Sequence, residues 1–262
     1  MRARSCLFCD NQSGSREHLW PAWIHRRLPK REPVRITFAG RPVAISNNPE
    51  IKVKTVCGDC NGGWMSDLEA ASIPVIGNLM QDIALPLDTS QQTLLSTWAV
   101  KTAMVLDSTN TRERSAFHTK SECEQLRLAS AIPAHTRVWI GRSALNGLHA
   151  DGTDVGIDAP DKTRIANGNA STFIVGHLAL QVFAVHPLPE HKDKYEDRIF
   201  NEVPSRPGPW DELLIQVWPA SSRTVTWPPP RTFTGTGTRY HIGQLLYRWR
   251  MGDRATVPIP SA

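Results

Sequence analysis

Apolar residues in the first part of the chain follow two periodicities that predict different elements. Residues 21–28 carry apolar side chains between two prolines, and Pro29 is expected to stop a short helix there. Residues 34–38 and 43–45 instead alternate between apolar and polar side chains, with a Gly-Arg-Pro turn between them. This alternation predicts a β-hairpin after the helix.

A further strand and a second helix are predicted next. Residues 51–55 alternate again and lead directly into Cys57. Trp64, Leu68 and Ala71 then recur at helical spacing, and Pro74 is expected to end that helix. The predicted order over the first 73 residues is therefore helix, hairpin, strand and helix.

The rest of the chain predicts helices first and strands afterwards. Thr89 with Gln92, and Ser121 with Glu124, have the spacing of capping boxes, and the first should begin a helix over 90–106. Runs of β-branched and aromatic residues predict strands at 137–140, 172–185, 213–218 and 224–227. Residues 186–210 are polar and proline-rich, which predicts a long loop, and a last helix is expected near 242–250.

These patterns predict an α+β protein in two parts, with residues 1–73 as one unit and residues 74–262 as an α+β region of unassigned fold. The chain has 262 residues, of which 40% are hydrophobic, so it can bury a core. The N-terminus has no apolar leader, and the longest apolar stretch, 173–185, is shorter than the roughly 20 residues of a spanning helix. We therefore expect a cytoplasmic protein without a membrane partner.

Positive charge is concentrated at the N-terminal end. Residues 1–60 hold 11 Lys and Arg and 5 Asp and Glu, a balance of +6, whereas the other 202 residues hold 19 and 20, a balance of −1. A basic segment beside a nearly neutral one suggests a polyanionic partner for the basic segment. A surface that is basic without a partner is the alternative.

Four of the five cysteines form two C-x-x-C pairs, Cys6 with Cys9 and Cys57 with Cys60. In a cytosolic chain, paired cysteines at this spacing are typical of a four-thiolate zinc site rather than of disulfides. Such a site is structural, because four thiolates leave no position for water or substrate. Cys123, the fifth, falls in a helical pattern and is expected to pack in the core.

Three further residues lie beside these pairs, and together they resemble a known family. Glu17 and His18 stand in the sequence Ser-Arg-Glu-His-Leu-Trp-Pro after the first pair, and Asn61 follows Cys60 directly. Across about residues 5–72 the chain resembles the zinc-knuckle branch of the HNH, or His-Me finger, endonucleases. The resemblance implies a zinc-stapled ββα-metal module that hydrolyses phosphodiester bonds of nucleic acid, with double-stranded DNA favoured.

The resemblance also implies roles for these residues. His18 matches the general base, while Glu17 and Asn61 match the ligands of one catalytic Mg²⁺ or Mn²⁺ ion. An imidazole can take a proton from water at neutral pH, and carboxylate and carboxamide oxygens suit a hard cation. Two positions differ from the family: Glu17 stands where Asp is usual, and Ile51 where a middle Asn is usual.

Other interpretations of these residues remain open. Glu17 and His18 could be a surface pair, and Asn61 could serve only the turn after the knuckle. Arg26, Arg27, Lys30 and Arg31 form a basic cluster that could contact phosphates or could be a solvated helix end. Lys101 lies at the edge of an apolar stripe, where lysines usually extend to solvent.

Two other functions remain possible for the whole protein. One is a zinc-containing module that binds nucleic acid without cutting it. The other is a protein–protein adaptor in which zinc only stabilises the fold. The first requires salt-dependent affinity for nucleic acid without metal-dependent cleavage, and the second requires no such affinity.

Overall fold

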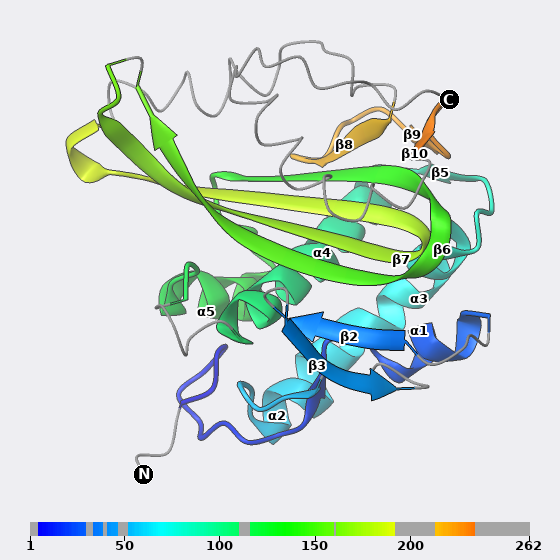
Figure 1. Ribbon diagram of the computed structural model, residues 1–262, viewed down its shortest axis with the longest axis horizontal. Helices are drawn as coiled ribbons and strands as arrows, with labels where there is room; N and C mark the ends of the chain where they lie inside the picture. The colour runs from blue at the N-terminus through cyan, green and yellow to red at the C-terminus, as the bar shows by residue number, and fades with distance from the viewer. Residues whose placement is uncertain are drawn as a thin grey trace.

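The computed structural model describes residues 5–29, 34–38, 41–46, 52–109, 116–159, 161–191 and 213–233. Within them the chain is an α+β protein, in which a long β-ribbon arches over helices (Figure 1). The helix expected near 242–250 and most of the loop expected at 186–210 lie outside the described residues, as do Lys30 and Arg31. None of the helices in the described part combines the length and apolarity that a membrane span requires.

The N-terminal elements follow the predicted order. They are β1 (Glu17–His18), α1 (Ala22–Arg27), β2 (Val34–Phe38), β3 (Arg41–Ser46) and β4 (Lys52–Val53). The helix α1 and the β2–β3 hairpin confirm their predictions. The short strand β1 pairs antiparallel with β4, which returns to it after the hairpin.

A helical stretch with a kink at Gly63 follows β4, and its second part passes through Pro74. It consists of α2 (Gly58–Cys60), the π-helical turn η1 (Asn61–Met65) and α3 (Ser66–Met80). The prediction that Pro74 ends this helix is wrong. A proline inside a helix costs about 3 kcal/mol. However, α3 beyond Pro74 buries four apolar side chains, each of which contributes about 1.5–3 kcal/mol: Val75, Ile76, Leu79 and Met80. The division of the chain after residue 73 stays a prediction.

Two further helices confirm their predictions, but their caps lie elsewhere. In α4 (Thr89–Thr109), Asp88 accepts a hydrogen bond from the Gln91 amide at 2.8 Å, and Gln91 accepts one from the Asp88 amide at 3.0 Å. In α5 (Lys120–Ala129) the capping box joins Thr119 and Glu122. Both caps lie one or two residues before the predicted ones, because several polar residues near each start have the required spacing.

The central sheet is built on two strands much longer than predicted. β6 (Thr136–Asp158) and β7 (Arg164–Pro187) pair antiparallel, with a bulge after Arg142. β8 (Leu214–Trp218) pairs antiparallel and β10 (Thr232–Phe233) parallel with β6, while β5 (Leu85–Leu87) pairs with β9 (Val225–Trp227). A short 3-10 turn, η2 (Pro189–His191), follows β7. Each of the four predicted strands coincides with part of one of these elements to within one residue at its start.

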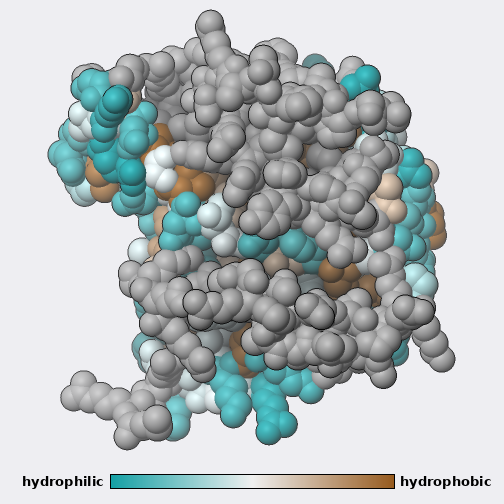
Figure 2. All heavy atoms as spheres, in the orientation of Figure 1, coloured by the Kyte–Doolittle hydropathy of each residue, from teal (hydrophilic) through white to brown (hydrophobic). Residues whose placement is uncertain are grey.

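One cluster of buried side chains connects the two predicted parts of the chain. It extends from Cys6 and Phe8, through α3 and α4, to Trp227 on β9. Cys6 and Phe8 lie in the first C-x-x-C turn, residues 6–9, which we call the first knuckle; residues 57–60 form the second knuckle. Helix α4 lies at the centre of the cluster and packs against α3, β6, β7 and β8. The far end of the β6–β7 ribbon has a separate small core that includes Ile157 and Ile165. Hydrophilic side chains cover this projecting end on the face shown in Figure 2.

The close approach of β7 to α3 depends on Gly176, which gives a first prediction. Gly176 has a φ of +62°, and a Cβ atom there would lie 2.3 Å from the carbonyl oxygen of Met80. Gly176→Ala should therefore lower the free energy of unfolding by at least about 2 kcal/mol, because both the backbone conformation and the contact are strained. Urea denaturation followed by circular dichroism measures this loss.

Gly152→Ala is the matched control on the paired strand. Its added Cβ would meet Leu106 at an ordinary 3.5 Å. We expect a change of less than about 0.5 kcal/mol for this variant. Equal losses in the two variants would contradict the role assigned to Gly176.

Candidate metal centre and active site

The four paired cysteines meet at one point. The Sγ atoms of Cys6, Cys9, Cys57 and Cys60 all lie within 4.8 Å of one another. The Sγ atom of Cys9 is 3.6 Å from that of Cys57 and 3.5 Å from that of Cys60. A tetrahedral zinc ion with Zn–S bonds of about 2.3 Å requires S···S distances of about 3.8 Å. The cluster can therefore hold a metal ion, and its spacing is compatible with zinc.

Backbone amides around the cluster point at the sulfur atoms. Cys6 accepts hydrogen bonds from the amides of Phe8 at 3.4 Å and Cys57 at 3.2 Å, and Cys57 accepts one from the amide of Cys60 at 3.4 Å. Burial opposes ionisation of Cys57, but the Cys60 amide and neighbouring thiols outweigh it and lower its pKa to about 7. Burial raises the pKa of Cys60 instead. The knuckles thus favour thiolate at Cys57 even before a cation binds.

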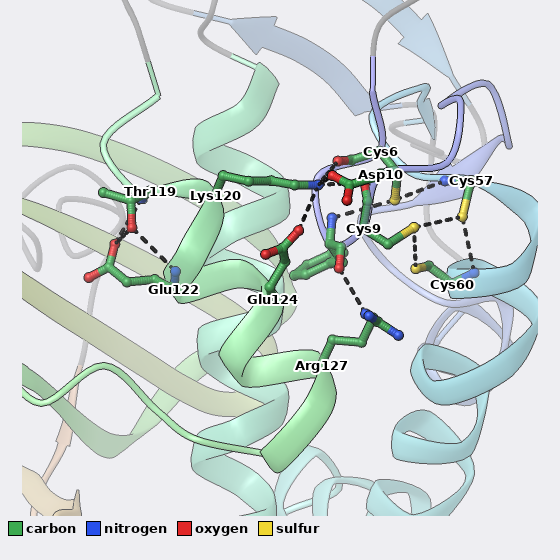
Figure 3. Close-up of polar contacts among 11 residues, drawn as sticks. Cys6, Cys9, Asp10, Cys57, Cys60, Thr119, Lys120, Glu122, Glu124 and Arg127 are labelled. Atoms are coloured by element: carbon green, nitrogen blue, oxygen red, sulfur yellow. Dashed lines mark hydrogen bonds and ion pairs between the residues drawn. The ribbon is translucent and has the colours of Figure 1, made fainter.

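Helix α5 holds the first knuckle in place through two cationic side chains (Figure 3). Lys120 donates to the carbonyl of Cys6 at 2.8 Å and also to the carbonyl of Cys9. Arg127 donates to the carbonyl of Phe8 at 2.8 Å. Since these carbonyls lie on a loop, the two cations satisfy backbone acceptors that no strand or helix pairs. If the four cysteines hold a divalent ion as thiolates, positive charge here would also offset the net negative charge of that centre.

Strand β1 places Glu17 and His18 on opposite faces. Glu17 lies opposite Val53 and is only 4% exposed, whereas His18 lies opposite Lys52 and is partly exposed. Successive side chains on a strand point in opposite directions, so one of the pair enters the core and the other faces outward. The surface-pair interpretation is therefore wrong for Glu17.

Glu17 and Lys101 are buried, and they form a charge cluster with the partly buried Glu69. The Lys101 ammonium is 3.0 Å from Glu69 Oε1 and 3.9 Å from Glu17 Oε1. Lys101 is 1% exposed and lies over the Trp98 ring. Burial raises the pKa of Glu17 to about 7, Lys101 opposes this rise, and Glu69 adds to it. The expectation that Lys101 extends to solvent is wrong, because its ammonium has two carboxylates to neutralise inside the protein.

Asn61 begins the turn η1 and connects it to the segment before β1. Its Nδ2 atom donates to the Ser15 hydroxyl at 2.7 Å, and the Ser15 amide donates to the Val56 carbonyl at 3.0 Å. Ser15 precedes Glu17 by two residues. Asn61 therefore helps to hold the start of β1 against the second knuckle, whether or not it also binds an ion.

The basic cluster has different surroundings from those expected. Arg27 donates to the Ile73 carbonyl at 3.2 Å and lies over the Trp23 ring, so it fastens α1 to α3. Gly77 makes this possible, because a Cβ there would lie 1.8 Å from an Arg27 nitrogen. Arg26 is exposed. A phosphate contact by Arg26 or Arg27 stays a prediction.

Comparison of the chain with family models, with curated proteins and with solved structures gives no match. The geometry of the site is therefore the basis for its functional interpretation.

Sequence patterns alone did not reveal the long-range partners of the site. Lys101, Lys120 and Arg127 each reach a segment more than 30 positions away. One signal was present for Lys101: alanine, valine and threonine surround it in the sequence. A lysine inside a helix that is apolar on all sides indicates a buried ion pair. Cys123 is buried and packed, as predicted, and burial raises its pKa to about 12.

The cysteine cluster gives a second prediction. The purified protein should contain about one zinc ion per chain by elemental analysis, and Cys57→Ser should lose the metal and most of its thermal stability, because binding and folding are coupled. Cys123→Ala is the control: its thiol lies outside the cluster, so this variant should keep the metal. A folded wild-type protein without metal would contradict the assignment.

The charge cluster around Lys101 gives a third prediction. Lys101→Met should lower the free energy of unfolding by about 3 kcal/mol or more, because Glu17 and Glu69 lose their counter-charge. Combining it with Glu17→Gln should recover part of this loss, since one buried carboxylate is then neutral. Urea denaturation of the single and double variants measures the coupling. Additive losses would show that Lys101 does not act on Glu17.

Proposed function

We propose that this protein is a metal-dependent endonuclease of the HNH type that hydrolyses phosphodiester bonds of double-stranded DNA. The observation that supports this most is the arrangement around the cysteine cluster. Two antiparallel strands, β1 and β4, are followed by a helix, and the strand β1 carries Glu17 and His18. If α1 and the β2–β3 hairpin, which separate β1 from β4 in the chain, are treated as an insertion, this order resembles that of a ββα-metal module. The cysteine cluster, with zinc as its proposed ion, lies beside both ends of this unit.

His18 is the proposed general base. It lies on the partly exposed side of the β1–β4 strand pair, so its imidazole can reach a water molecule beside a bound phosphodiester. The imidazole accepts the proton of that water as the oxygen attacks phosphorus in line with the departing 3′ oxygen. Removal of a positioned base of this kind slows such reactions about 10²-fold or more.

Glu17 and Asn61 are the proposed ligands of the catalytic ion. Their carboxylate and carboxamide oxygens fit Mg²⁺ or Mn²⁺, which prefer oxygen donors. When bound, such an ion neutralises charge on the phosphate and on the leaving oxygen. The Lys101 ammonium already lies 3.9 Å from Glu17, so a divalent ion has to compete with it for this carboxylate.

That competition also favours a second candidate function. If Lys101 neutralises Glu17 permanently, the same fold binds nucleic acid without cutting it. The buried position of Glu17, with a pKa raised to about 7 by burial, is the observation that supports this alternative. Catalysis and binding are separable by experiment, because only catalysis needs His18 and a divalent ion.

The fourth prediction tests His18 as the base. Wild-type protein should nick supercoiled plasmid with Mg²⁺ or Mn²⁺, and His18→Ala should cut about 10²-fold more slowly while it keeps its zinc and its DNA affinity. Glu17→Ala should mainly raise the metal concentration required, and Asn61→Ala should do so more mildly. Gel assays of nicked and linear plasmid measure the rates.

The control is His191→Ala, which removes a histidine on the turn η2, outside the elements that carry the candidate site. This variant should cut as fast as the wild type. If His18→Ala cuts at the wild-type rate, or if the wild type cuts neither DNA nor RNA with any divalent ion, the nuclease proposal fails and the binding module takes its place.

A further inference from the structure

The ribbon formed by β1 and β4 has one face in the core and one face toward solvent. Glu17 and Val53 pair across it and are 4% and 7% exposed. His18 and Lys52 form the next cross-strand pair, and Lys52 is exposed. Directly opposed residues of an antiparallel pair project on the same side, so Lys52 stands beside His18 on the outward face.

Further cations extend this outward face. Arg16 precedes β1 and Lys54 follows β4, and both are exposed. Within residues 16–18 and 52–54 the single acidic residue is Glu17, which is buried on the other face. The solvent side of these two stretches therefore carries basic side chains without an acidic one among them. We call Arg16, Lys52 and Lys54, which lie around His18, together the basic ribbon face.

We propose that the basic ribbon face binds the phosphate backbone of duplex DNA, and that Lys52 holds a phosphate group next to His18. This inference rests on the proposed function and deepens it. Cross-strand neighbours have Cβ atoms about 5 Å apart. A phosphate that contacts the Lys52 ammonium therefore lies within reach of a water molecule activated by His18. Lysine contacts of this kind supply affinity without sequence preference.

The basic ribbon face is better placed for this contact than the cluster on α1. The helix α1 does not carry the proposed base. Lys52 lies directly opposite His18 in the β1–β4 register, and Lys54 lies two positions after Lys52. The charge balance of +6 over residues 1–60, from 11 basic and 5 acidic residues, includes these lysines.

Binding without cleavage tests the proposal. The zinc-loaded full-length protein is titrated into a fluorescein-labelled 20-base-pair duplex without added divalent ions, and anisotropy is recorded from 50 to 300 mM NaCl. The double variant Lys52→Gln/Lys54→Gln should bind at least about tenfold more weakly at 100 mM salt. The plot of log K against the logarithm of the salt concentration should become shallower. The magnitude of its slope should decrease by about two, since each lost phosphate contact removes about 0.9.

Two matched variants are the controls. Lys162→Gln/Arg223→Gln removes two exposed cations elsewhere in the chain and should leave the slope unchanged. Arg26→Gln tests the cluster on α1 and should change the slope less than the Lys52/Lys54 variant does. An unchanged slope in the Lys52/Lys54 variant overturns the proposal, and so does a wild-type protein that does not bind the duplex.

The outcome is distinguishable from failure of the nuclease proposal. A protein that binds DNA through Lys52 and Lys54 but never cuts it supports the basic ribbon face and rejects the catalytic role of His18. A protein that cuts DNA while the Lys52/Lys54 variant keeps its full salt slope rejects the basic ribbon face alone.

Discussion

The four-cysteine cluster is the constraint on which the candidate site depends. It brings the segment around Cys6 and Cys9 to the segment around Cys57 and Cys60, which lie 48 or more positions apart in the sequence. The strands β1 and β4 pair over only two residues each, which is too few to be stable alone. Because their ends are fixed by the cluster, these short strands can still present Glu17 and His18 in a defined register.

Side chains that follow the candidate site in the chain also stabilise it. Lys120 and Arg127 on α5 satisfy carbonyls of the first knuckle, and Lys101 on α4 neutralises Glu17 from within the core. The same hydrophobic cluster runs through both parts. The recognisable residues of the site lie in the first 61 positions, and they are thus held by side chains that lie 84 to 119 positions after the residues they contact.

The sequence predicted what is encoded locally and missed what depends on distant contacts. The helix α1, the β2–β3 hairpin and the meeting of the cysteine pairs follow from short patterns of proline, alternation and C-x-x-C spacing. Pro74 was misinterpreted because the burial of Ile76 and Leu79 outweighs the cost of a proline in a helix. The full length of β6 and β7 was missed because residues 147–158 include glycines and polar residues that only cross-strand pairing orders.

Because the candidate site depends on Lys101, its N-terminal residues cannot be transferred to another protein by themselves without loss of a stabilising charge. The buried Glu17 and the partly buried Glu69 both depend on one ammonium group, that of Lys101 on helix α4. If residues 5–80 were grafted onto another scaffold, the graft would contain the cysteine cluster but would lack the Lys101 ammonium. The graft would keep every recognisable motif residue and yet contain an uncompensated acid beneath its candidate base. The candidate motif is therefore shorter than the piece of chain that supports it: the motif ends near Asn61, whereas the side chains that stabilise it extend to α4 and α5.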